Sequence, residues 1–118
     1  HGDRVRKRYE KLKPGKRDRV DHSDRLEWDK PSGTVLVGSA AGGGRPHVHP
    51  DEPRVITVRE AARLQTFPDN WIFAGTSTDQ YRQVGNAVPV LLSRAVGEGL
   101  LQQLLRPKPE IAVSTIVS

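Results

Sequence analysis

The apolar and polar positions divide the chain into a loop-rich amino-terminal part and a helical carboxy-terminal part. After Pro89, apolar residues recur at the i, i+3, i+4, i+7 spacing of one helix face. This spacing predicts a long helix with Pro89 in its first turn and its end before Pro107. Its apolar face consists of Val88, Leu91, Leu92, Ala95, Val96, Leu100 and Leu104. A shorter helix is expected over residues 79–84, closed by Gly85.

Two more helices are predicted nearer the amino terminus. Residues 4–12 should form one, since Pro14 and the glycine after it stop a helix. Residues 58–66 should form the other, because Thr57 and Glu60 have the spacing of a capping box. In a capping box each of the two side chains binds the backbone N–H of the other residue. The long helix that follows needs a partner for its apolar face. When that face is exposed, we expect marginal stability or self-association.

The segments between the helices favour extended structure. The β-branched run 34–37 predicts a short strand, and residues 54–57 predict a second extended stretch. Three consecutive glycines at positions 42–44 let the backbone approach another surface closely. Trp28 should be the main apolar anchor of the part before them. We therefore predict an α+β fold, a small domain of short strands and glycine-rich loops followed by helices.

Positive charge is concentrated at the amino-terminal end. Residues 1–19 contain nine Lys or Arg and three acidic residues, a net +6, so the remaining residues carry −1 of the total of +5. A basic segment suits phosphate contacts, because each neutralised phosphate releases condensed counterions. A solvated basic face or a disordered arm is the alternative interpretation.

Several kinds of chemistry are excluded by the composition. The 118 residues contain no cysteine, which rules out disulfides, thiolate metal sites and a Cys nucleophile within this sequence. His47 and His49 lie two apart in a proline-rich loop, which favours a solvated loop over a metal site. No apolar run approaches the ~20 residues of a membrane span, so no membrane partner and a cytoplasmic, nucleoid-associated location are expected. The absence of methionine indicates a piece of a longer chain or removal of the initiator.

Two segments resemble signature blocks of the DNA cytosine-5 methyltransferases. Residues 54–69 (RVITVREAARLQTFPD) resemble the ninth block of this family. Residues 80–89 (QYRQVGNAVP) resemble the tenth and last block. Residues 34–44 resemble the end of the variable target-recognition region, which precedes the ninth block. The order and spacing are those of the family, and the resemblance covers about residues 26–105.

The resemblance implies a methyl transfer in which this chain is one contributor. In the family, a Cys attacks C6 of a flipped-out cytosine, and C5 takes a methyl group from S-adenosylmethionine; the target atoms are inaccessible in a stacked duplex. The Cys and the glycine-rich cofactor loop belong to the family's amino-terminal two-thirds and are not found here. This chain alone is therefore expected to be inactive. The tenth block would complete the cofactor pocket, with Asn86 and the Ala87 backbone near the methionine carboxylate. A simple helix stop and cap is the alternative for Asn86.

The resemblance also implies DNA contacts and scaffold residues. Recognition loops of the family approach DNA where Thr34, Gly42, Gly43 and Gly44 lie here. Arg45 would bind a guanine edge, with phosphate or solvent as its alternatives. Arg59 would meet phosphate. Thr57, Glu60 and Arg63 would be structural, with Arg59, Glu60 and Arg63 at helical spacing suited to ion pairs.

Four parts are expected: a basic target-recognition part (1–33), a small DNA-recognition domain with the ninth-block helix (34–75), tenth-block helices (76–106) and a tail (107–118). The last helix would return to a Rossmann-like catalytic domain outside this sequence. The implied function is the carboxy-terminal part of a DNA cytosine-5 methyltransferase, with double-stranded DNA and the catalytic domain, in the same chain or a separate subunit, as partners. A non-catalytic DNA-binding specificity subunit of a split enzyme and a degenerate remnant are the alternatives.

Overall fold

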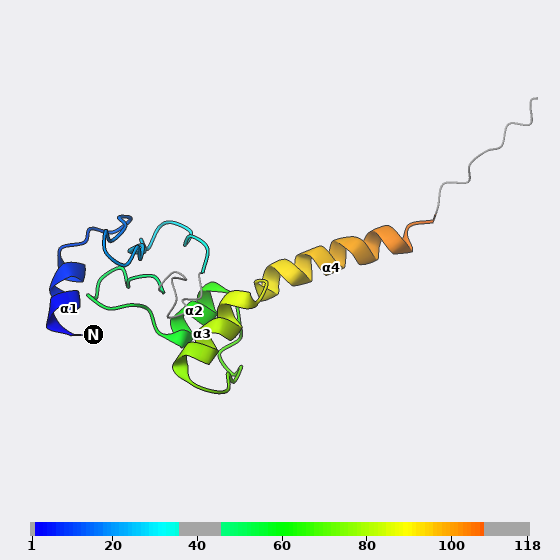
Figure 1. Cartoon of the computed structure of the whole chain (residues 1–118). Helices are drawn as coiled ribbons and strands as arrows, with labels where there is room; N and C mark the ends of the chain where they lie inside the picture. The colour runs from blue at the N-terminus through cyan, green and yellow to red at the C-terminus, as the bar shows by residue number, and fades with distance from the viewer. Residues whose placement is uncertain (1, 36–45, 108–118) are drawn as a thin grey trace, which may run out of the picture.

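The computed structural model describes residues 2–35 and 46–107, and its four helices follow one another along the chain (Figure 1). They are α1 (Asp3–Glu10), α2 (Val58–Leu64), α3 (Ser77–Asn86) and α4 (Val90–Leu105). Helices were therefore predicted in the right places, with ends that differ by a few residues. In the described parts, irregular loops with several turns lie between α1 and α2 (Figure 1).

The two predicted strands do not form within the described ranges, which corrects the α+β assignment. Only isolated bridges are present there, pairing Arg17 with Asp24, and Val48 with both Arg25 and Val55. Prolines flank Val48 at positions 46, 50 and 53. Because proline has no N–H to donate, a ladder through Val48 cannot lengthen in either direction. Thr34 and Val35 form no bridge, and the rest of that predicted strand lies outside the described residues.

The amino-terminal part is tied to the rest of the fold by a buried arginine. Arg25 is only 7% exposed, and its guanidinium donates to the carbonyls of Tyr9 and Leu12 at 2.7 Å and of Pro50 at 2.9 Å. These bonds join the end of α1 to the loop that follows the undescribed segment. Tyr9 is fully buried and anchors this part. The prediction for Trp28 was wrong: Trp28 is 70% exposed and donates its indole N–H to the Asp51 carboxylate.

A small core lies where α2 packs on α3. Ile56, Ala61, Ala62, Phe73 and Val84 are its buried members. The partly buried hydrophobics around it are Leu26, Val35, Val58, Phe67 and Tyr81. The hydroxyl of Tyr81 also donates to the Ile56 carbonyl at 2.6 Å, which adds a polar tie between α3 and the segment that precedes α2. The core thus fixes the relative position of the two segments that resemble the ninth and tenth blocks.

Both central helices begin with a capping box. Thr57 and Glu60 form the predicted one at the start of α2. Thr76 and Asp79 form a second, which the sequence analysis missed, so α3 begins two residues earlier than predicted. The prediction that Gly85 closes this helix was also wrong, because α3 continues through Gly85 to Asn86.

Helix α4 projects away from the core (Figure 1). Pro89 is its N-cap rather than part of the first turn, and none of its residues is buried. Leu91, Leu92, Val96, Leu100 and Leu104 are each more than half exposed. The predicted apolar face is therefore uncovered in this chain. No helix in the described ranges is long and apolar enough to cross a membrane.

Candidate cofactor-binding and DNA-contact site

The turn between α3 and α4 contains Asn86 and Ala87, the two residues expected near the cofactor. Asn86 ends α3, is exposed, and forms no side-chain hydrogen bond with a described residue. The Ala87 N–H already donates to the Val84 carbonyl at 3.3 Å. The next N–H, that of Val88, has no partner in the described part of the chain. The donors left free at this turn are therefore the Asn86 amide and the Val88 N–H.

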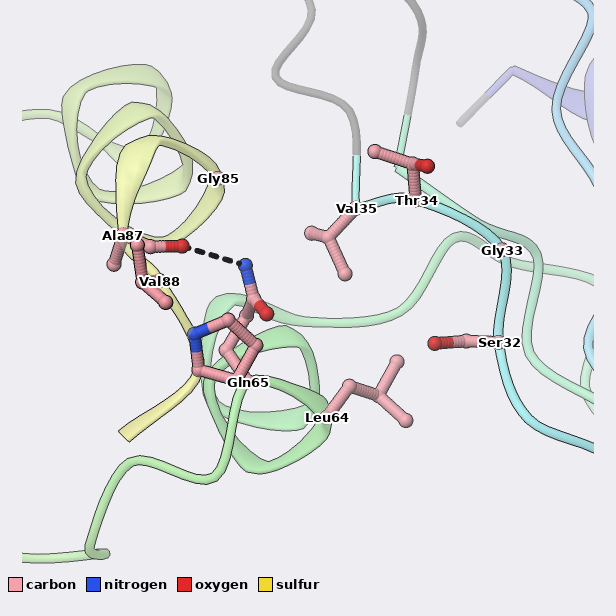
Figure 2. A pocket seen from close by; sticks show the side chains of 10 residues that line it. Ser32, Gly33, Thr34, Val35, Leu64, Gln65, Gly85, Ala87 and Val88 are labelled. Atoms are coloured by element: carbon pink, nitrogen blue, oxygen red, sulfur yellow. Dashed lines mark hydrogen bonds between the residues drawn. The ribbon is translucent and has the colours of Figure 1, made fainter. Parts of the chain in front are cut away.

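A cavity of about 550 Å³ separates this turn from the segment that contains Thr34 (Figure 2). Ser32 to Val35 form one wall, and Gly85, Ala87, Val88 and Pro89 form the other. Leu64 and Gln65 complete the lining from the end of α2. The fold thus brings Thr34, a predicted DNA-contacting residue, across from the predicted cofactor turn. Asn86 itself does not line this cavity.

Glu60 is held by an arginine that the sequence analysis did not single out. The guanidinium of Arg54 contacts both carboxylate oxygens of Glu60, at 2.8 and 3.0 Å, and also bonds to Glu52. Hydrogen bonding to Arg54 lowers the pKa of Glu60 to about 2 and raises the pKa of Arg54. The capping box turns Glu60 back toward the amino end of α2, where Arg54 lies. The expected ion pairs among Arg59, Glu60 and Arg63 along the helix are therefore not the ones that form.

The two arginines of α2 make other contacts. Arg63 pairs with Asp69 through two bonds of 2.8 and 2.9 Å, and this contact lowers the pKa of Asp69. Arg59 donates to the Trp71 carbonyl at 2.8 Å and lies over the Phe73 ring. Its other terminal nitrogen is buried without a partner in the described structure. Arg59 is therefore bound within the fold, and its geometry does not support a phosphate contact.

The remaining predicted DNA-contacting residues, Gly42, Gly43, Gly44 and Arg45, lie outside the described residues. Within the described ranges, no group of three His, Asp or Glu side chains is placed to hold a metal ion. His49 is used locally: its Nδ1 accepts the backbone N–H groups of Asp51 and Glu52 at 3.2 and 3.1 Å. His47 is buried and its Nε2 lies 3.3 Å from the Gly33 carbonyl.

Replacing Glu60 with Gln should lower the free energy of unfolding by about 1 kcal/mol at pH 7, because a partly exposed ion pair and a helix cap are both weakened. The pKa of Glu60 falls from 4.5 in the unfolded chain to about 2 in the fold. Its contribution is thus complete above about pH 4.5 and disappears as the pH falls through 2. Urea unfolding at pH 7 and pH 2.5 measures the difference in free energy of unfolding between the variant and the unsubstituted chain.

Glu98→Gln is the matched control for that experiment, since Glu98 forms a single surface pair with Arg94 at 2.8 Å on α4. This variant should unfold like the unsubstituted chain at both pH values. If Glu60→Gln lowered the free energy of unfolding by as much at pH 2.5 as at pH 7, the assigned role of Glu60 would be contradicted.

Comparison with known proteins shows the family of this chain. Residues 3–102 match the family of C-5 cytosine-specific DNA methylases. The chain is 51% identical over 80 residues to the type II methyltransferase M.Eco47II of Escherichia coli, covering 68% of this chain and 19% of that protein. It is 42% identical over 115 residues to M.XorII of Xanthomonas oryzae, covering 93% of this chain and 27% of that protein. This chain belongs to the C-5 cytosine-specific DNA methylases.

A solved structure is also similar. It is that of a DNA modification methyltransferase encoded within a prophage of E. coli, with a TM-score of 0.69 and 34% identity. The alignment covers 90% of this chain and 28% of that one. The chain spans 6% to 27% of the length of the curated relatives that it matches, including a mouse DNA (cytosine-5)-methyltransferase at 42% identity.

Proposed function

We propose that this chain is the target-recognition and pocket-closing part of a DNA cytosine-5 methyltransferase. It contributes contacts to duplex DNA and completes the S-adenosylmethionine pocket for methyl transfer to C5 of a flipped cytosine. The observation that carries the proposal is the α3–α4 turn, which faces the segment containing Thr34 across one cavity. Membership of the family supports the reaction class.

The α3–α4 turn suits the methionine end of the cofactor. A carboxylate accepts hydrogen bonds, and the Asn86 amide and the Val88 N–H are donors with no partner among the described residues. S-adenosylmethionine supplies the methyl group when bound. The contribution of this chain is to bind and orient the carboxylate at the end of α3.

A region outside these 118 residues must supply the nucleophile, because the sequence contains no cysteine. We use "the complete enzyme" for this chain together with that Cys-bearing region, whether the two are one polypeptide or two subunits. In the second case the chain acts as the specificity subunit of a split enzyme. In both cases the exposed apolar residues of α4 pack on the catalytic domain, which removes them from water.

An outer row of cations on α1 is the part that we assign to DNA phosphates. Arg4, Lys7 and Lys11 follow one another at spacings of three and four, which places them on one side of the helix. All three are exposed and form no ion pair with a described residue. Arg8 lies beside this row, but it is partly buried and neutralised by Asp18 and Asp21. The outer row is therefore free to meet an anionic backbone.

Changing Arg4, Lys7 and Lys11 together to Gln should weaken duplex binding by the complete enzyme for every DNA sequence tested. The slope of log K against log salt should become shallower by about 2 to 3, since each released phosphate contact removes about 0.9. Titration of labelled duplexes at four salt concentrations measures both quantities. The control changes Arg82 on α3, Arg94 on α4 and Arg106 just after α4, three exposed cations, and should keep the slope. An unchanged slope in the α1 variant would show that these cations do not contact the DNA phosphates.

A further inference from the structure

One buried polar side chain joins the ninth-block helix to the tenth-block turn. Gln65 follows α2, is 9% exposed, and donates from its Nε2 to the carbonyls of Val84 and Ala87, each at 3.2 Å. Figure 2 shows the bond to Ala87 at the edge of the cavity. These two carbonyls bracket Asn86. The Val84 carbonyl also accepts the Ala87 N–H, whereas the Ala87 carbonyl has no other partner among the described residues. The Gln65 amide therefore adds a second bond to the first carbonyl and supplies the bond of the other.

The orientation of this amide follows from its surroundings. An amide nitrogen carries two hydrogens, and two carbonyl oxygens lie within reach of it. Turning the amide over would place its oxygen against the same two carbonyls, which offer no hydrogen to accept. Glutamine satisfies both acceptors only in this orientation. Aspartate, glutamate or an apolar residue at this position cannot do so at neutral pH.

The same segment also holds the start of α4. The Gln65 carbonyl accepts the Val90 N–H at 3.2 Å, and the Thr66 hydroxyl accepts the Leu91 N–H at 3.0 Å. Thr66 has a φ of 59°, a left-handed conformation that a β-branched residue adopts only under constraint. The turn from Val84 to Leu91 is therefore held at both ends by two consecutive residues after α2.

We propose that Gln65 is a positioning residue for the cofactor site: it fixes the turn that presents the Asn86 amide and the Val88 N–H. The proposal rests on the proposed function of that turn. Gln65 donates both of its amide hydrogens inside the fold, so it acts on the cofactor only through the turn. Its loss leaves the donors in place and lets the peptide around Asn86 move. Affinity for the cofactor carboxylate then falls because the turn must be ordered on binding.

The test replaces Gln65 with Met, which keeps the length and the unbranched shape of the side chain but has no hydrogen to donate. The dissociation constant of S-adenosylmethionine for the complete enzyme, measured by calorimetry, should rise about 5- to 20-fold, the loss of one to two hydrogen bonds. The KM for the cofactor should rise similarly, with kcat at saturating cofactor and the Kd for duplex DNA each within about twofold. Amide exchange of residues 86–88 should become faster in the variant.

Gln83→Met is the matched control, because Gln83 also donates to a carbonyl, that of Ala74 at 2.7 Å, but from an exposed position on α3. Its cofactor affinity should match that of the unsubstituted enzyme. Unchanged cofactor affinity in Gln65→Met would overturn the positioning role. Equal losses of cofactor and DNA affinity would overturn it too, since they indicate general unfolding. Failure of the unsubstituted complete enzyme to bind the cofactor would instead refute the proposed function.

Discussion

Replacing Asn86 with Ala should weaken binding of S-adenosylmethionine to the complete enzyme by about 10- to 100-fold, because a hydrogen bond to a charged group contributes about 1.5–3 kcal/mol. The fold should be nearly unaffected, since the Asn86 side chain is exposed and bonds to no described residue. Calorimetric titration of the cofactor and thermal unfolding of the same preparation measure the two effects separately.

Asn70→Ala provides the control, because Asn70 is exposed in the loop between α2 and α3, away from the α3–α4 turn. It should bind the cofactor as the unsubstituted enzyme does. If Asn86→Ala and Asn70→Ala bound the cofactor equally well, the Asn86 amide would have no role in the pocket. The helix-end interpretation of Asn86 would then be sufficient.

The second large effect is expected in the core. Phe73→Ala should lower the free energy of unfolding by about 3–5 kcal/mol, the usual cost of truncating a buried phenylalanine. Phe73 is 9% exposed, contacts the Phe67 ring edge-on with centroids 5.2 Å apart, and lies under the Arg59 guanidinium. Removing the ring leaves a void between α2 and α3. Urea unfolding, followed by circular dichroism, measures the loss.

Ile72→Ala is the control for this substitution, since Ile72 is the neighbouring residue but is 88% exposed. Its free energy of unfolding should change by less than about 0.5 kcal/mol, as for other surface substitutions. Equal destabilisation by the two substitutions would mean that Phe73 does not belong to the core. The position of the α3–α4 turn relative to α2 would then lack its packing support.

Helix starts were predictable where the signal is local. Thr57 and Glu60 are three residues apart, and their capping box forms as the sequence indicated. The same signal in a weaker form, Thr76 with Asp79, was passed over. The end of α3 was not predictable from Gly85 alone. Gln65, almost twenty residues earlier, satisfies the carbonyl of Val84 in the last turn of α3, and the helix continues to Asn86.

Burial of the aromatic residues could not be read from the sequence, because it depends on contacts between distant segments. Trp28 is larger and more apolar than Tyr9, yet Tyr9 is buried and Trp28 is exposed. The difference lies in Arg25, which binds the Tyr9 carbonyl and brings the end of α1 against the loop at Pro50. Such a contact is set by the fold as a whole and leaves no periodic pattern in the sequence.

The candidate site was likewise predictable only in part from the sequence. Asn86 and Ala87 were predicted from the resemblance of the tenth block, and their roles stay predictions. Gln65 lies in the helix predicted over residues 58–66, but no role was predicted for it, because its partners lie on α3 and on the turn after it. Arg54 was missed for a similar reason: its carboxylate partner is turned toward it by the capping box, which a helical-spacing argument does not consider.

The most direct test of the central claim is methyl transfer by a chimaera in which this chain replaces the 115 matching residues of M.XorII. Incorporation of labelled methyl groups into duplex DNA would be measured for the chimaera, for M.XorII without those residues, and for this chain alone. We expect 5-methylcytosine from the chimaera and none from either part by itself. A folded, DNA-binding chimaera that transfers no methyl group, or transfer by this chain alone, would contradict that claim.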